Sequence, residues 1–317
     1  MSSAHGPDRT SVVVTGGSGF IGRAVVRALR DRDVPVTVVD RVPFPDDGDG
    51  DGVRVVTGDL RDAAVREEAV TRETAGIVHL AALTSVLKSV ELPEDTFADN
   101  VLVTQELLEL ARRREVPKFL LASTNAVIGN VGTATITPDL PLRPLTPYGA
   151  TKAACEMLLS GYAGAYGMTT CALRFTNVYG PGMSHKDSFV PRMMRAALTG
   201  TGIKIYGDGR QRRDLVHVDD VVRALLLALG SGHTGRAIVG AGRSVSVLEM
   251  VEAVREVTGA ELPVEHVEAP AGEMPAVVVD VSASAETIGY EPSVSLTDGL
   301  ATAWKYFSGL DRPNATP

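Results

Sequence analysis

With 317 residues, the chain is long enough for one large α/β domain or for a nucleotide-binding domain with a smaller partner. Its formal net charge of −8 gives no basic footprint, which argues against nucleic acid as a partner. The two cysteines, Cys155 and Cys171, lack metal-ligand spacing, which argues against a disulfide framework or a zinc site.

The N-terminus is polar and lacks the apolar core of a signal peptide. No apolar run approaches the ~20 residues that a membrane-spanning helix requires. We therefore expect a cytoplasmic protein without a membrane partner.

Short β-branched runs alternate with longer helical patterns in the first half of the chain. Six runs are predicted to be strands: Val12–Thr15, Val36–Asp40, Val53–Thr57, Ile77–Leu80, Phe119–Ser123 and Cys171–Phe175. Four stretches are predicted to be helices: Phe20–Arg30, Ala63–Thr71, Pro93–Arg114 and Tyr148–Tyr166. Because strands that are apolar throughout are buried on both faces, the pattern predicts an α/β fold with a doubly wound parallel sheet.

After Gly180 the predicted elements become shorter. They are helices at Val190–Leu198, Val218–Leu229, Val247–Thr258 and Leu296–Phe307, and strands at Ile203–Tyr206 and Val264–Val267. We expect residues 11–180 to form one domain and residues 181–308 a smaller mixed lobe, partly interwoven with the first. A ligand is expected between them, at the carboxyl ends of the parallel strands.

A glycine-rich turn, Thr15–Gly22, joins the first predicted strand to the first predicted helix. Gly16, Gly19 and Gly22 would let the backbone approach a pyrophosphate closely. The helix that starts at Phe20 and Ile21 would present its unpaired N–H groups to the same ligand. This turn predicts a dinucleotide site.

Asp40 closes the second strand, roughly 20 residues after the turn, where a carboxylate can accept hydrogen bonds from the ribose hydroxyls of adenosine. That position favours NAD over NADP, although the neighbouring Arg41 could hold a 2′-phosphate. Asp59, after the third strand, could reach the adenine edge or could simply cap the helix that begins at Ala63.

Tyr148 and Lys152 lie four residues apart at the start of a predicted helix. This spacing places phenol and ammonium on one face, where the cation would bring the tyrosine pKa from ~10 toward neutrality. Such a tyrosine is a general acid or base at neutral pH. Thr124, at the end of the fifth strand, would bring a hydroxyl into the same cleft.

These motifs together resemble the extended short-chain dehydrogenase/reductases, and within them the NAD-dependent nucleotide-sugar epimerases and dehydratases. The resemblance covers residues 11 to 308 in order, and it implies a Rossmann-type NAD-binding domain with the second lobe holding substrate. It rests on Thr15–Gly22, Asp40, Gly58–Leu60, His79–Ala82, Asn100, Ser123–Thr124, Tyr148–Lys152, Leu173–Pro181, Gly207–Gly209 and Arg213–Asp220.

The resemblance implies three groups of site residues. The catalytic group is Thr124, Tyr148 and Lys152. The NAD-binding group is Gly16, Gly19, Phe20, Ile21, Gly22, Asp40, Arg41, Asp59, Leu60, Ala81, Ala82, Asn100, Tyr148 and Lys152. The substrate-binding group is Thr124, Asn177 and Arg213; for Asn177 and Arg213 the alternatives are a turn residue and a pair with Asp214. The loop Gly182–Ser188 is expected to border the sugar, and its Ser184, His185 and Lys186 could contact hydroxyls or a carboxylate, or could be solvated loop residues.

The related 4,6-dehydratases carry an Asp-Glu pair directly after the catalytic Thr, whereas this chain has Asn125 and Ala126. The similar UDP-glucuronate decarboxylases usually carry Glu at the position of Ala126. The sequence thus favours a 4-epimerase that passes a hydride to NAD⁺, rotates a 4-keto sugar and returns the hydride to its opposite face. The alternatives are a nucleotide-sugar 4-ketoreductase, a UDP-glucuronate decarboxylase and, least favoured, a non-catalytic NAD-binding scaffold.

Two departures from the family pattern bear on the substrate. The late loop has Pro270–Met274 where an Arg is common, and Ile128 replaces a usual Tyr. UDP is the expected nucleotide. Both the UDP-glucose/UDP-galactose pair and the UDP-glucuronate/UDP-galacturonate pair stay open.

The resemblance also implies a homodimer, formed through the helices Pro93–Arg114 and Tyr148–Tyr166. Cys155, Leu158, Leu159 and Tyr162 would suit that interface or the core equally well. No metal is expected, because the acidic stretch Asp47–Gly52 has Gly58 where a calcium loop needs Glu.

Overall fold

The computed structural model describes residues 10–45, 52–269 and 274–310. Two expectations therefore fall largely outside the described residues: the acidic stretch at 47–51 and the 270–273 part of the late loop.

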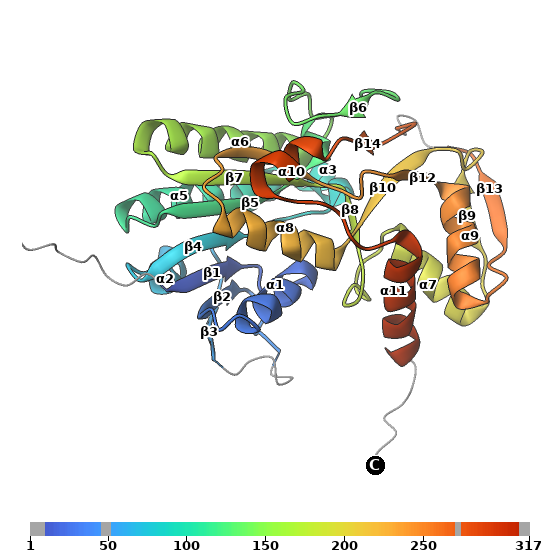
Figure 1. Cartoon of the computed structure of the whole chain (residues 1–317), viewed down its shortest axis with the longest axis horizontal. Coiled ribbons are helices and arrows are strands. Elements are labelled where there is room, and N and C mark those ends of the chain that lie inside the picture. The colour runs from blue at the N-terminus through green and yellow to red at the C-terminus, as the bar shows by residue number, and fades with distance from the viewer. Residues whose placement is uncertain (1–9, 46–51, 270–273, 311–317) are drawn as a thin grey trace, which may run out of the picture.

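The central sheet has seven strands in the order β11–β7–β5–β4–β1–β2–β3 (Figure 1). Their bounds are β1 Ser11–Thr15, β2 Val36–Asp40, β3 Val53–Thr57, β4 Thr74–His79, β5 Lys118–Thr124, β7 Thr169–Phe175 and β11 Gly235–Val239. Every neighbouring pair is parallel, which confirms the predicted doubly wound sheet. The direction of winding reverses between β1 and β4, where such sheets open a crevice for ligands.

Helices cover both faces of this sheet. On one face, α1 (Phe20–Arg30) packs beside α8 (Val218–Gly230), and α10 (Ser282–Ile288) lies next to β11. The other face carries α2 (Ala63–Ala69), α5 (Val103–Arg113) and α6 (Pro147–Tyr166), with α5 and α6 stacked together in Figure 1. Successive residues of β1 serve opposite cores: Val12 and Val14 pack with the α1 side, and Val13 packs with the α5 side. This explains why the strands are apolar throughout.

The stretch predicted as one helix at Pro93–Arg114 is divided into three. It comprises α4 (Pro93–Phe97), a single π-helical turn η1 (Ala98–Leu102) and α5, and the short α3 (Val86–Glu91) precedes it. A π-helical turn widens the helix locally and often occurs at functional sites. Here it contains Asn100, whose contacts are described below.

The C-terminal elements form a second layer at one end of the molecule, on the right in Figure 1. Their core joins α7 (Phe189–Thr199), α9 (Val247–Thr258) and α11 (Leu296–Leu310) to β9 (Ile203–Tyr206) and β13 (Val264–Val267). A three-stranded sheet with the order β12–β10–β8 connects this layer to the first, and a two-stranded sheet pairs β14 with β6. The bounds of these strands are β6 Thr135–Ile136, β8 Asn177–Tyr179, β10 Arg212–His217, β12 Ser244–Ser246 and β14 Val278–Val279.

Residues after position 180 also return to the large sheet. Helix α8 packs against α1, and β11 pairs with β7, so the seventh strand comes from the second half of the chain. None of the described helices combines the length and the apolar character that crossing a membrane requires.

Candidate active site

A large cavity of about 1160 Å³ lies where the carboxyl ends of β1, β2, β4 and β5 face the C-terminal layer. Most of the predicted site residues line it: Gly16, Gly19, Phe20, Ile21, Gly22, Asp40, Arg41, Leu60, Ala81, Ala82, Thr124, Tyr148, Lys152, Asn177 and Arg213. Asp59, Asn100, Ser184 and His185 do not line it. The volume exceeds that of a typical single-ligand pocket, which suits a dinucleotide together with a second ligand.

The glycine turn forms one end of the cavity. Gly16 has a φ of +69°, and a Cβ there would lie 2.8 Å from the amide nitrogen of Ala81. A Cβ on Gly22 would collide with the carbonyl oxygen of Gly16. Helix α1 begins after Gly19 without a side-chain cap, so its first N–H groups are available to an anion in the cavity. The cradle therefore fits a dinucleotide pyrophosphate.

Asp40 lies beside this turn at the end of β2. Its Oδ2 accepts a hydrogen bond from the backbone N–H of Ser18 at 3.1 Å, and its Oδ1 accepts one from Val42 at 3.1 Å. A carboxylate has about four lone-pair sites, so these two bonds leave capacity for ribose hydroxyls.

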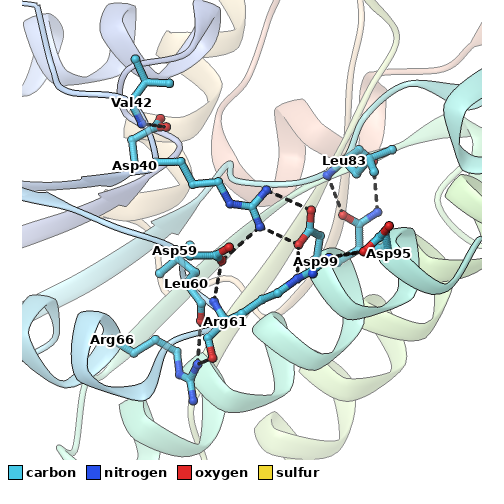
Figure 2. A network of polar contacts seen from close by, with 11 residues as sticks. Asp40, Val42, Asp59, Leu60, Arg61, Arg66, Leu83, Asp95 and Asp99 are labelled. Atoms are coloured by element: carbon cyan, nitrogen blue, oxygen red, sulfur yellow. Dashed lines mark hydrogen bonds and ion pairs between the residues drawn. The ribbon is translucent and has the colours of Figure 1, made fainter. Parts of the chain in front are cut away.

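Arg41 is held by two carboxylates, those of Asp59 and Asp99, which are labelled in Figure 2. Its guanidinium lies 3.0 Å from Asp59 and 2.7 Å from Asp99, and Asp99 also pairs with Arg61 at 2.6 Å. The hydrogen bonds that Arg41 donates to Asp99 and Asp59 raise the pKa of its guanidinium. Asp59 thus lies outside the cavity and orients Arg41, and both arginines already have anionic partners. This arrangement opposes a 2′-phosphate next to Asp40.

Replacing Asp40 with serine is expected to raise the dissociation constant for NAD⁺ about tenfold or more, the effect of losing a charge-assisted hydrogen bond. The substitution also removes the repulsion between the Asp40 carboxylate and the 2′-phosphate of NADP⁺. The ratio of the NADP⁺ and NAD⁺ dissociation constants should therefore become smaller. Titration calorimetry with both cofactors measures the ratio. Because both cofactors share the pyrophosphate turn, any loosening of that turn cancels in the ratio, and an unchanged ratio would contradict this role of Asp40.

Tyr148, which was predicted to be catalytic, is positioned by the first turn of α6. Thr146 caps the helix by accepting the N–H of Gly149, and the N–H of Tyr148 donates to Oγ of Ser89 at 3.1 Å. A Cβ on Gly149 would lie only 2.7 Å from the carbonyl oxygen of Ala126. Glycine at this position therefore lets α6 approach the end of β5, which brings Tyr148 within hydrogen-bonding reach of Thr124.

The predicted tuning of Tyr148 is wrong for this structure. Burial raises the pKa of Tyr148 to about 12, and a hydrogen bond from Thr124 opposes that rise. Burial also lowers the pKa of Lys152, whose side chain is 2% exposed. The sequence predicts the charge of Lys152 but not the loss of solvent around the phenol. In the folded protein this loss of solvent has the larger effect on the pKa of Tyr148.

A buried ionic cluster lies directly behind these residues. Arg174 binds Glu156 through two hydrogen bonds of 2.9 and 2.7 Å, and both side chains are 0% exposed. Ser123 donates to the same carboxylate at 2.6 Å, and Arg236 lies 3.3 Å from it. Ser123 precedes Thr124 on β5, and Glu156 follows Lys152 by one turn on α6. The hydrogen bond between Ser123 and Glu156 therefore fixes the end of β5 against α6.

Asn100 was expected at the cofactor, but the structure places it behind the cavity wall. It is 1% exposed, and its amide exchanges two hydrogen bonds with the backbone of Leu83 and donates to Thr151 at 3.0 Å. All of its polar capacity is directed at the protein, so it fixes the loop after β4 against α6.

His79 belongs to a buried chain of hydrogen bonds in the same wall. Thr104 donates to the carbonyl of Asn100, so it accepts from Nε2 of His79 at 3.0 Å. Nδ1 of His79 is then the acceptor for Thr15 at 2.7 Å, and Thr15 in turn accepts from the N–H of Ala81. Burial, with a contribution from the charge of Lys152, lowers the pKa of His79 to about 3.

Because His79 is buried in its neutral form, we expect the folded protein to lose stability in acid. The folded protein keeps His79 neutral, whereas the unfolded chain binds a proton below its ordinary pKa of 6.5. Stability is therefore retained above pH 6.5 and falls as the pH decreases toward 3, by about 1.4 kcal/mol per pH unit at this site. Urea unfolding of the parent protein and of His79→Gln across this range should give a shallower pH dependence in the variant, and parallel curves would contradict the prediction.

Asn177 and Arg213 approach the cavity from β8 and β10, which pair in parallel. Asn177 donates to the backbone carbonyl of Asp214 at 3.1 Å, and Arg213 donates to that of Met274 at 2.9 Å. The carboxylate of Asp214 is buried and accepts the N–H of Ala241. Both predicted substrate residues thus face the cavity while anchored to backbone.

The loop between β8 and α7 differs from expectation. Ser184 hydrogen-bonds the hydroxyl of Tyr306 at 3.0 Å, and His185 is exposed outside the cavity. Lys186, which was expected from the same loop, does line the cavity, as does Asp187. Several other lining residues were not predicted, because they belong to no motif: Thr84, Met183, Arg192, Arg195, Tyr206 and Gln211.

Comparison with known proteins places this geometry in a family. The UDP-glucose 4-epimerase of Corynebacterium glutamicum is 31% identical, over 96% of this chain and 98% of that protein. The dTDP-glucose 4,6-dehydratase of Actinoplanes sp. is 34% identical, over 92% of this chain and 97% of that protein. Relatives of both activities therefore match nearly the whole chain.

Solved structures agree with this result. The protein MoeE5 in complex with UDP-glucuronic acid and NAD has a TM-score of 0.87 and is 36% identical, covering 95% of this chain and 99% of its own. The NAD dependent epimerase/dehydratase family matches residues 12–241, which include the glycine turn, Tyr148 and Lys152. This chain is therefore a member of the NAD dependent epimerase/dehydratase family.

Proposed function

We propose that this protein inverts the configuration at C4 of a nucleotide sugar, a UDP-hexose or a UDP-hexuronic acid, through a transient 4-keto sugar. NAD⁺, when bound, supplies the hydride acceptor for this reaction and later returns the hydride. The remaining roles fall to side chains that line the cavity.

In this proposal Tyr148 removes the proton of the C4 hydroxyl as the carbon loses its hydride, and it returns the proton after the sugar has turned. The Thr124 hydroxyl beside the phenol opposes the rise in the pKa of Tyr148 that burial causes. Lys152 holds the nicotinamide ribose with its buried ammonium. Asn177 and Arg213 bind the phosphates of the substrate, which leaves the sugar free to rotate.

One observation carries the choice of epimerisation over dehydration. Among the described residues, the carboxylates that line the cavity are Asp40, Asp99 and Asp187. Asp40 and Asp99 lie at the adenosine end, and Asp187 is bound bidentately by Arg192 at 2.7 Å. Elimination of water needs an acid and a base beside the sugar. The positions that follow Thr124 hold Asn125 and Ala126, which supply neither.

The test is product analysis with the purified enzyme. Incubation with NAD⁺ and, separately, UDP-glucose, UDP-galactose, UDP-glucuronate and UDP-galacturonate should yield the C4 epimer of one pair, detected by proton NMR. No net change is expected in the absorbance band of reduced nicotinamide. The proposal would be contradicted by the absence of any C4-inverted product, by stoichiometric use of NADH or by release of carbon dioxide. A separate incubation with dTDP-glucose that yields a 4-keto-6-deoxy product would also contradict it.

The proposal keeps the expected homodimer through the 93–114 stretch and α6, and it adds the neighbouring α3 to the interface. Cys155 and Leu159, which sequence considerations left between interface and core, belong to the core. Other apolar side chains of these elements are exposed instead: Leu87 at 77%, Val90 at 62%, Leu102 at 51%, Met157 at 49% and Tyr166 at 57%. Exposed apolar side chains gathered on neighbouring helices support a protein partner there. Light scattering should give twice the mass of the chain.

A further inference from the structure

The loop between β8 and α7, residues 180–188, is firmly attached to the protein. Two hydrogen bonds join Arg192 to Asp187, both of 2.7 Å. Arg195 donates to the backbone carbonyls of Ser184 and Lys186, each at 3.1 Å. The backbone of this loop is thus fixed by α7, and two of its residues, Lys186 and Asp187, line the cavity.

Lys186 is the cation that this loop presents to the cavity. Its side chain is half-buried, and its ammonium has no hydrogen-bond or ion-pair partner in the described part of the chain. Burial lowers its pKa, and no neighbouring anion offsets the effect. An ammonium in this condition gains stability from any anion that enters the cavity.

Three other cations that line the cavity are paired with carboxylates. Arg192 and Arg195 both contact Asp187, and Lys204 lies 3.8 Å from Glu265. Arg213, assigned above to the phosphates, also donates to the backbone carbonyl of Met274. The carboxylate of Asp187, next in sequence, is shared by two arginines, so the ammonium of Lys186 is available to an anion in the cavity.

We propose that Lys186 binds an oxyanion of the nucleotide-sugar substrate, an inference that rests on the proposed function. Two chemical groups on such substrates are oxyanions. One is the diphosphate, which is present in every nucleotide sugar, and the other is the carboxylate of a hexuronic acid. Each assigns Lys186 a different role: anchoring the nucleotide in the first case, and selecting hexuronates over hexoses in the second.

The experiment is calorimetric binding to the NAD-loaded enzyme, in a Tyr148→Phe background that prevents turnover. UDP, UDP-glucose and UDP-glucuronate are titrated into this background and into the same protein carrying Lys186→Met. Loss of a charge-assisted contact should weaken binding about tenfold or more. An equal loss for all three ligands identifies the diphosphate, and a loss confined to UDP-glucuronate identifies the carboxylate.

Two further variants secure the interpretation. Lys305→Met removes the same charge from the exposed face of α11 and should leave all three affinities unchanged. Lys186→Arg keeps the charge and should retain most of the binding, which separates the role of charge from damage to the loop. Affinities of Lys186→Met within twofold of the background for all three ligands, or a loss confined to UDP-glucose, would overturn the inference. A background protein that binds none of the three would instead overturn the proposed function.

Discussion

Substitution of Tyr148 by phenylalanine is expected to lower kcat at least ~100-fold, the effect of losing a general acid–base catalyst. The phenol is the group that Thr124 contacts, and its oxygen is the atom that would exchange a proton with the sugar. The change removes one oxygen and leaves the ring in place, so folding and NAD⁺ binding should persist. Steady-state assays of C4 inversion and thermal unfolding measure both.

Tyr166 provides a matched control on the same helix. Its ring is 57% exposed at the C-terminal end of α6, far along the helix from the cavity. Tyr166→Phe should therefore keep the parent kcat. Near-parent activity in Tyr148→Phe would remove this tyrosine from the reaction, and equal losses in the two variants would indicate an effect on the helix.

Replacement of Glu156 by glutamine is expected to lower the free energy of unfolding by about 3–5 kcal/mol, the range for breaking a fully buried ion pair. The substitution keeps the shape of the side chain but leaves the guanidinium of Arg174, which is 0% exposed, without its counter-charge. Urea unfolding followed by circular dichroism gives the change. Because Ser123 also loses a charged acceptor, the segment leading to Thr124 should loosen as well.

The same substitution at Glu109 tests whether burial causes the effect. Glu109 also pairs with an arginine, Arg112, at 2.7 Å, but both side chains face solvent, where water and salt screen the charges. Glu109→Gln should therefore leave the unfolding curve nearly unchanged. Combining Glu156→Gln with Arg174→Met removes both buried charges and should recover much of the loss. A Glu156→Gln protein as stable as the parent would contradict the assigned role of the cluster.

The sequence predicted the sheet and its cofactor end well because those features depend on local rules. A strand buried on both faces must be apolar throughout, as Val12–Val14 are, and a strand-to-helix turn that approaches its own backbone closely must be glycine, as at Gly16. Six of the strands in the large sheet were found in this way. The seventh, β11, has only Ala237–Val239 as an apolar run, and its place is set by pairing with β7.

The substrate end could not be predicted as well, because it depends on contacts between distant segments. The loop residues Ser184 and His185 are turned away from the cavity since Arg195 and Tyr306, from other helices, hold the backbone and the hydroxyl of Ser184. Likewise, the π-helical turn that directs Asn100 at Leu83 is invisible in helical periodicity. The pKa of Tyr148 was misjudged because burial is a property of the assembled cavity.

The late arrival of β11 has a consequence for how the protein is made. When the ribosome has released β7, that strand is the open edge of an unfinished sheet, with its N–H and C=O groups unpaired on one side. It stays so until residues 235–239 emerge, some 60 residues later. Nascent chains that stall in this interval would expose the unpaired edge of β7 to strands of other chains. Truncation between β7 and β11 should therefore produce aggregates rather than a smaller NAD-binding protein.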